Sequence, residues 1–245
     1  MNTANRYYFD FCDRLALRRL LPEHGERFVD VCGGYGRLAR EYLGNFKEAF
    51  LFDYAPNLLA QAKVHYGGRL QTVQGTVYEM PFASGEFDAL ILIRAALHLT
   101  DLNAAVGEIT RILKNGGIAV IEIANKQNIF EIARWLCGRS TLRPFSPEPA
   151  SRNTAGFYYY HPRYVEQIFH NNGLRVKKTV AVSGLRRHVS SNCKGVPLLC
   201  ALEYFLQYTI GRVKWSASIF YLLEKCRRAA GNITLGESHE NNTEP

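Results

Sequence analysis

Residues 28–38 read FVDVCGGYGRL, an apolar stretch that runs into a glycine-rich turn. The apolar part predicts a short buried strand, and the glycines allow a ligand to approach the backbone of the turn. We expect a helix to follow through Leu38 and Leu43, with free N–H groups at its N-terminus. A strand, a glycine turn and a helix in this order are typical of sheets that bind nucleotide-like ligands.

Strand-like and helix-like stretches alternate along the rest of the chain. The apolar runs predict strands over residues 28–31, 49–52, 70–73, 87–93, 118–123, 174–182 and 218–223. Cap and proline signals predict helices from Pro56, from Asp101 to a stop at Gly116-Gly117, from Pro162 to Asn172, and over residues 198–208. This alternation predicts a doubly wound α/β fold with a parallel sheet.

We expect one domain over residues 1–230 of the 245-residue chain. Between about residues 125 and 160 the periodicity is lost and prolines collect, which indicates an insertion or lid. Residues 231–245 form a polar tail that we expect to be disordered.

Composition narrows the class of protein. The six cysteines contain no CxxC pair, so neither a zinc site nor a disulfide framework is indicated. No leader pattern and no long apolar run is found, and a cytoplasmic location is therefore expected. The net charge of +8 comes from scattered cations and fits solubility better than a dedicated nucleic-acid surface.

Two carboxylates decide between candidate ligands. Asp53 closes the second predicted strand about 20 residues after the glycines, where it can accept hydrogen bonds from ribose hydroxyls of either NAD or S-adenosylmethionine. Asp30 lies just before the glycine turn, where an anion disfavours a bound pyrophosphate and favours a cationic methionine. An NAD-dependent oxidoreductase is therefore the weaker interpretation.

At this point the sequence resembles the class I S-adenosylmethionine-dependent methyltransferases, in particular methyltransferase type 11 and the quinone-biosynthesis methyltransferases. The resemblance covers residues 28–123 and rests on the order and spacing of five motifs: the glycine turn, FDYAP at 52–56, MPF at 80–82, LH at 97–98 and LKNGG at 113–117. It implies a Rossmann-like, mostly parallel seven-stranded sheet with helices on both faces and an antiparallel last strand. Three positions depart from the family pattern, because Cys32, Thr76 and Asn115 stand where a glycine, an aspartate and a proline are usual.

The resemblance also implies site residues. S-adenosylmethionine, which leaves as S-adenosylhomocysteine, would be bordered by the cofactor-binding residues Asp30, Cys32, Gly33, Gly34, Gly36, Asp53, Tyr54, Thr76, Val77 and Arg94. Asp53 would hold the ribose, Tyr54 would flank the adenine, and Arg94 would lie near the amino-acid part. His98 stands where the family places residues that face the transferred methyl group, and it either accepts a proton or only lines the pocket. Four further residues would either close the substrate pocket or only pack against neighbouring side chains: Tyr7, Tyr8, Tyr159 and His161.

The expected reaction is direct methyl transfer to a small-molecule acceptor whose O, N or C atom is not identified. Nucleic-acid amines are disfavoured because Ile93-Arg94-Ala95-Ala96 replaces the Pro-Pro-aromatic element of many amine methyltransferases. The alternative is a methyltransferase-fold protein that acts on nucleic acid, or on a membrane-associated lipid or quinone, through a basic surface. Its cations would be Arg175, Lys177, Lys178, Arg186, Arg187 and Lys194. The nearby apolar run 196–202 contacts lipid in this alternative, or else forms a core helix.

Overall fold

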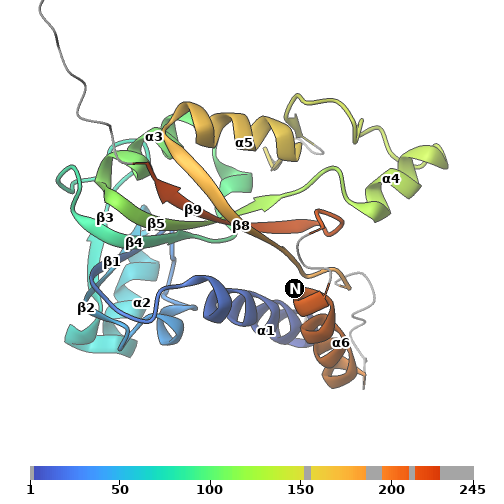
Figure 1. The fold of residues 1–245 in the computed structure, drawn as a ribbon. Helices are drawn as coiled ribbons and strands as arrows, with labels where there is room; N and C mark the ends of the chain where they lie inside the picture. Colours follow the sequence, from blue (N-terminus) through green and yellow to red (C-terminus); the bar gives the residue numbers. More distant parts are fainter. Residues whose placement is uncertain (1–2, 152–155, 186–194, 210–212, 227–245) are drawn as a thin grey trace, which may run out of the picture.

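The computed structural model describes residues 3–151, 156–185, 195–209 and 213–226. A seven-stranded sheet forms its centre, with the strand order β3-β2-β1-β4-β5-β9-β8 (Figure 1). The strands are β1 (Gly25–Val31), β2 (Phe46–Asp53), β3 (Gln71–Gln74), β4 (Phe87–Leu92), β5 (Leu113–Ala124), β8 (Leu174–Val182) and β9 (Ser218–Lys225). β1 to β5 pair in parallel, and β9 runs antiparallel between β5 and β8. The predicted α/β sheet with an antiparallel last strand is confirmed.

Helices cover both faces of the sheet (Figure 1). One face carries α1 (Thr3–Leu20), α2 (Pro56–Tyr66) and α6 (Val196–Thr209), and the other carries α3 (Leu102–Ile112) and α5 (Pro162–Asn171). Each layer has its own apolar core against the sheet. The clearest sequence signal is α3, where the Asp101 carboxylate accepts a hydrogen bond from Ala104 N at 2.9 Å and five apolar side chains are buried.

Strand order reverses between β1 and β4, which pair in parallel at the centre of the sheet. At such a reversal the connections leave toward opposite faces and open a crevice at the carboxyl ends of the strands. The glycine turn follows β1 at this edge, and the segment with Arg94 and His98 follows β4. The topology therefore brings together two of the segments that the sequence had marked.

The α-helix that we expected after the glycine turn is absent, and this prediction is wrong. Only a short 3-10 turn, η1 (Ala39–Glu41), follows. Gly34 and Gly36 adopt left-handed φ values of 60° and 76°, which interrupt the regular backbone that an α-helix needs. In addition, Arg14 of α1 donates to the Arg37 carbonyl at 2.7 Å, so a side chain from another element takes an oxygen that a helix would use.

Two further elements differ from the sequence interpretation. Helix α3 ends at Ile112 and β5 begins at the next residue, so Gly116-Gly117 lies inside the strand and does not stop the helix. No helix was predicted at the N-terminus, yet α1 covers residues 3–20 and packs against β8 and α6.

The predicted lid contains short elements in place of regular periodic structure. They are α4 (Ile129–Leu136), β6 (Ala150–Ser151) and β7 (Tyr158–Tyr159). β6 and β7 pair with each other in a separate two-stranded sheet. The predicted polar tail from residue 231 and the three cations Arg186, Arg187 and Lys194 lie outside the described residues.

Candidate cofactor and acceptor site

The backbone of the glycine turn after β1 has a conformation that residues with side chains rarely adopt. Cys32, Gly34 and Gly36 all have left-handed φ values, of 55°, 60° and 76°. A Cβ on Gly33 would meet the Asp30 carboxyl carbon at 2.5 Å and Leu51 Cδ1 at 2.4 Å. A Cβ on Gly34 would meet only Leu58 at 3.6 Å, so the backbone of this residue borders open space. The turn therefore packs tightly on its inner side and is open on its outer side.

Asp53 joins this turn to the next one. Its carboxylate accepts from Gly34 N at 2.8 Å through Oδ2 and from Ala55 N at 2.9 Å through Oδ1. The residue is only 4% exposed. Each carboxylate oxygen has a second lone pair, so both can accept a further hydrogen bond from a hydroxyl. The next residue, Tyr54, is 76% exposed and its ring is available to a flat ligand.

Asp30 lies beneath the turn, away from the cavity described below. Its carboxyl accepts from Tyr42 Oη at 3.1 Å and is 2% exposed. Burial raises the pKa of Asp30 to about 7, although the hydrogen bond from Tyr42 and the charge of Arg37 act in the opposite direction. Near neutral pH this group is therefore protonated in much of the population, and it supports the turn from inside.

The other predicted cofactor residues differ in exposure. Burial, with the nearby charges of Asp53 and Asp30, raises the pKa of the Cys32 thiol to about 12, so the thiol stays neutral at pH 7. Thr76 is exposed beyond β3 and forms an isolated bridge with Glu79. Val77 is buried in the apolar core, which leaves its backbone, not its side chain, for a ligand.

A cavity of about 730 Å³ opens at the carboxyl edge of β4 and β5. Three of the predicted residues contribute to its wall, Arg94, His98 and Tyr159. The remaining lining residues were not predicted: Arg6, Phe9, Asp10, Asp13, Tyr35, Arg37, Gln61, Leu97, Glu122, Ala124 and Ser218. The cavity volume suits a small-molecule ligand.

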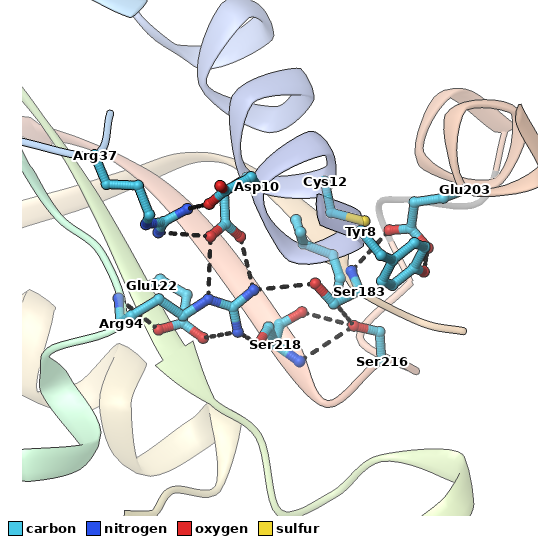
Figure 2. Close-up of polar contacts among 12 residues, drawn as sticks. Tyr8, Asp10, Cys12, Arg37, Arg94, Glu122, Ser183, Glu203, Ser216 and Ser218 are labelled. Carbon is cyan, nitrogen blue, oxygen red and sulfur yellow. Dashed lines mark hydrogen bonds and ion pairs between the residues drawn. The ribbon is translucent and has the colours of Figure 1, made fainter. Parts of the chain in front are cut away.

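Charged side chains form a connected cluster on one side of this cavity (Figure 2). Asp13, which is fully buried, accepts from Arg94 Nη2 at 2.7 Å and from Arg37 Nη2 at 2.9 Å. Arg37 also pairs with Asp10, which lies one helical turn before Asp13 on α1. Two arginines from loops after β1 and β4 are thus held by two acids from a single helix.

Arg94 donates all five of its N–H groups to protein acceptors. They go to both oxygens of Asp13, to Ser183 Oγ at 3.0 Å, to Ser218 Oγ at 2.8 Å and to Glu122 Oε1 at 3.4 Å. Burial alone would lower the pKa of Arg94, but the charges of Asp13 and Glu122 raise it above its ordinary value. Although Arg94 lines the cavity, no donor remains for a ligand carboxylate unless one of these contacts breaks.

His98 ends the short turn η3 (Ala96–His98) and lines the same cavity. Its ring lies edge-on to Phe157 with 5.0 Å between the ring centroids. Tyr159, from β7, lines the cavity as well. The structure therefore brings the predicted candidate base and one predicted pocket tyrosine to one space.

The other predicted pocket residues lie elsewhere. Tyr7 is 61% exposed on α1, and Tyr8 is fully buried with its hydroxyl donated to Glu203 at 2.8 Å. His161 caps α5 by accepting from Arg163 N at 3.2 Å. Burial, and then the charges of Lys126 and Arg163, lower the pKa of His161, which suits this neutral capping role.

Sequence signals for the missed residues exist but are weak. Arg6, Asp10 and Asp13 follow each other at spacings of four and three, which places them on one face of a helix. Glu122 interrupts the otherwise apolar run 118–124, where a carboxylate needs a partner. Neither signal predicts that the N-terminal helix and the segment with Glu122 meet at Arg94.

Two cations of the predicted basic surface near β8 share one carboxylate. Arg175 and Lys177 both pair with Glu224, at 2.8 Å and 2.9 Å. These two cations lower the pKa of Glu224 to about 2. Among the described residues, no group of three histidine, cysteine or acidic side chains is placed to hold a metal ion.

Comparison with known proteins agrees with this geometry. Residues 29–121 match the family model described as a methyltransferase domain. Residues 29–121 are a class I methyltransferase domain. The match begins in β1, ends in β5 and includes the glycine turn, Asp53, Arg94 and His98.

A relative and two solved structures are similar to this chain. The chain is 29% identical over 117 residues to the ubiquinone/menaquinone biosynthesis C-methyltransferase UbiE of Cereibacter sphaeroides, covering 44% of this chain and 47% of that protein. A methyltransferase in complex with the Trm112 activator of Haloferax volcanii matches with a TM-score of 0.64 and 15% identity, over 93% and 99% of the two chains. The 1,6-didemethyltoxoflavin-N1-methyltransferase of Burkholderia thailandensis, with bound S-adenosylhomocysteine, matches with a TM-score of 0.61 and 12% identity, over 90% and 80%. The chain thus spans about half the length of the UbiE relative.

The methyltransferase domain match leaves out much of the cavity wall. Asp10 and Asp13 precede the matched residues, and Glu122, Tyr159 and Ser218 follow them. Part of the cavity wall is therefore built from segments outside the matched residues.

Proposed function

We propose that this protein transfers the methyl group of S-adenosylmethionine to a small-molecule acceptor. The observation that supports it most directly is the junction of Asp53 with Gly34 at the reversal of strand order, beside a cavity of about 730 Å³. The methyltransferase domain match over residues 29–121 supports the same reaction.

The residues present fit this cofactor. The outer side of Gly34 is open, and Asp53 keeps free lone pairs for two ribose hydroxyls. Exposed Tyr54 would flank the adenine, and the exposed Thr76 hydroxyl with the Val77 backbone would border its edge. The backbone of residues 32–36 would border the methionine part.

The chain's own contribution to the reaction is alignment and, for a hydroxyl acceptor, removal of a proton. Bound S-adenosylmethionine would supply an electrophilic methyl group, so no covalent intermediate with the protein is needed. The cavity walls from α1, η3 and β7 would hold the acceptor and exclude water. His98 is the candidate proton acceptor, and Arg94, whose donors are all occupied, would position α1 against β5.

The acceptor that we favour is a small ring compound such as a quinone precursor. The support is the resemblance to UbiE and the aromatic and aliphatic part of the cavity wall, formed by Phe9, Leu97 and Tyr159. A C-methylation of an ionised ring would need no base, whereas an O-methylation would use His98.

Calorimetric titration with S-adenosylmethionine, S-adenosylhomocysteine and NAD tests the cofactor. We expect saturable binding of the first two and at least about tenfold weaker binding by Asp53→Asn, which loses the negative charge and one of the two oxygens that accept hydrogen bonds from hydroxyls. Glu26→Gln is the matched control, because Glu26 is an exposed carboxylate outside the cavity that pairs with Lys47. Folded wild-type protein that binds neither sulfur compound, or that prefers NAD, would overturn the proposal.

A second experiment tests His98. With a hydroxyl acceptor, His98→Asn should lower kcat by about 10²-fold or more while the KM for S-adenosylmethionine changes little. If His98 only lines the pocket, KM for the acceptor will rise and kcat will stay within a few-fold of wild type.

A further inference from the structure

Helix α6 exposes several apolar side chains to solvent, while its buried side carries two polar residues beside Val196 and Cys200. Its buried residues include Glu203, which is 1% exposed, and Gln207, which is 2% exposed. Apolar and aromatic side chains face outward with exposures of 42% to 73%: Leu198, Leu202, Tyr204, Phe205 and Tyr208. An ordinary surface helix buries its apolar stripe, whereas α6 leaves these five apolar and aromatic side chains exposed.

Specific hydrogen bonds fix this orientation. The Glu203 carboxylate accepts from Ser183 N at 2.7 Å, Gly184 N at 3.1 Å and Tyr8 Oη at 2.8 Å (Figure 2). Gln207 Nε2 also donates to Glu203, at 3.0 Å. Rotating α6 to bury its apolar side would leave these buried donors and the carboxylate without partners, at a large cost in free energy. The outward apolar face is therefore built into the fold.

Helix α4 in the lid repeats the pattern. Its one carboxylate, Glu131, is 3% exposed and accepts from the Ser140 hydroxyl, while Ile129 is 54% and Leu136 71% exposed. Trp135 is also exposed and packs edge-on against exposed Phe145, with 5.8 Å between the ring centroids. Two helices from distant parts of the chain thus expose apolar and aromatic side chains.

The charged residues near these two helices indicate the kind of partner that they would contact. Between residues 129 and 148 the exposed charged side chains are Arg134, Arg139, Arg143 and Glu148, and Glu131 is buried. The exposed cations of this segment therefore outnumber its one exposed acid. On α6 the only charged residue is the buried Glu203, and the Arg19 guanidinium lies 3.9 Å from the centre of the Tyr208 ring. The partner should therefore offer apolar material together with negative charge.

Both helices lie at the end of the molecule where β5 and β8 end, with α4 and α6 on opposite sides of that edge (Figure 1). The cavity opens at the same edge. We define the apolar end face by its exposed side chains: Ile129, Trp135, Leu136, Phe145, Leu198, Leu202, Tyr204, Phe205 and Tyr208.

We propose that the apolar end face docks on an anionic phospholipid bilayer. A bilayer interface supplies acyl chains for the leucines, an interfacial zone for the aromatic rings, and phosphates for the three arginines. A second copy of this chain that docked through the α4 segment would instead bring like charges together at Arg134, Arg139 and Arg143. Within the described residues no helix is long and apolar enough to cross a membrane, so the contact would be interfacial.

Sedimentation with vesicles tests this docking and needs neither cofactor nor acceptor, so its result is separate from that of the proposed methyl transfer. We expect the protein to bind phosphatidylcholine vesicles that contain about 30 mol% phosphatidylglycerol, and to bind pure phosphatidylcholine much more weakly. The double variant Leu198→Ser, Phe205→Ser should bind about tenfold or more weakly. Val64→Ser is the matched control, because Val64 is 89% exposed on α2, away from the apolar end face, and should leave binding unchanged.

Fluorescence gives a second measurement. The chain has two tryptophans, and Trp135 lies in the apolar end face. Its emission should shift to shorter wavelength with the anionic vesicles, and Trp135→Phe should abolish the shift. Absence of binding to both vesicle types overturns the proposal. So does a wild-type dimer in solution that becomes monomeric in the Leu198→Ser, Phe205→Ser variant, since the face would then cover a second copy.

Discussion

The glycine turn and the Arg94 cluster lie at the same edge of the sheet but are built from different parts of the chain. In the glycine turn, the key contact joins a backbone N–H to the carboxylate of Asp53, only 19 residues later. In the Arg94 cluster, side chains meet from Asp13, Glu122 and Ser218, which are 81, 28 and 124 residues away from Arg94. The first site depends on local backbone conformation and the second on the packing of distant segments.

This difference predicts how each site fails. A substitution in the glycine turn should act through backbone geometry and steric clash, with little effect beyond the turn. A substitution in the Arg94 cluster should leave buried charges without partners and so weaken the attachment of α1 to the sheet.

The largest expected effect is in the Arg94 cluster. Arg94→Met keeps a similar side-chain length but removes one of the two arginine partners of the fully buried Asp13, and the guanidinium partner of Glu122, which is 1% exposed. We expect the free energy of unfolding to fall by about 3–5 kcal/mol, measured by urea denaturation.

Arg18→Ala is the control for that measurement. Arg18 pairs with Glu41, but its side chain is 68% exposed, so its removal should cost about 1 kcal/mol or less. Equal losses in the two variants would show that the Arg94 cluster contributes no more than a surface ion pair.

The second effect is on the pH dependence of stability and concerns Asp30 under the glycine turn. Burial raises its pKa from 3.8 to about 7 in the folded state, so between these values the folded protein binds more protons than the unfolded chain. Its contribution to the free energy of unfolding is full below about pH 4 and is lost as the pH rises through 7, a decrease of a few kcal/mol.

Asp30→Asn should remove this part of the pH dependence while keeping an oxygen that accepts from Tyr42 Oη. The measurement is urea denaturation at several pH values between 4 and 8. An unchanged slope in Asp30→Asn would mean that Asp30 is ionised in the folded protein throughout this range.

The third effect is steric and local. A Cβ on Gly33 would lie 2.4 Å from Leu51 Cδ1 and 2.5 Å from the Asp30 carboxyl carbon, so Gly33→Ala should cost about 1–3 kcal/mol and weaken cofactor binding. Gly68→Ala is the control, because a Cβ there meets nothing within 4 Å. Thermal unfolding and calorimetric titration of both variants separate loss of stability from loss of binding.

The same contrast explains what the sequence could predict. Apolar runs and caps predicted each strand of the central sheet and helices such as α3 and α5, because those signals are local. Asp53 was predicted because its distance from the glycines is set by one strand, turn and strand unit. The antiparallel last strand was implied by the resemblance, and the order of the strands was not predicted.

The errors came from interactions between distant segments. The expected helix after Gly36 failed because the glycines take left-handed φ values and because α1 supplies Arg14 to the Arg37 carbonyl. Asp13 and Glu122 were missed because each is an isolated acid in its own segment and only the fold brings both to Arg94. Polar pairing across such distances leaves no periodic pattern in the sequence.

The smallest effect is also the sharpest test of the Arg94 cluster as a unit. Ser218→Ala removes the hydroxyl that accepts from Arg94 Nη1 at 2.8 Å, and should cost about 1 kcal/mol in wild-type protein. In the Arg94→Met background that donor is already gone, so the same substitution should cost almost nothing further. Urea denaturation of the four proteins gives this coupling energy. Additive losses in the free energy of unfolding would mean that Ser218 stabilises β9 independently of Arg94. Arg94 would then stabilise the protein only through Asp13 and Glu122.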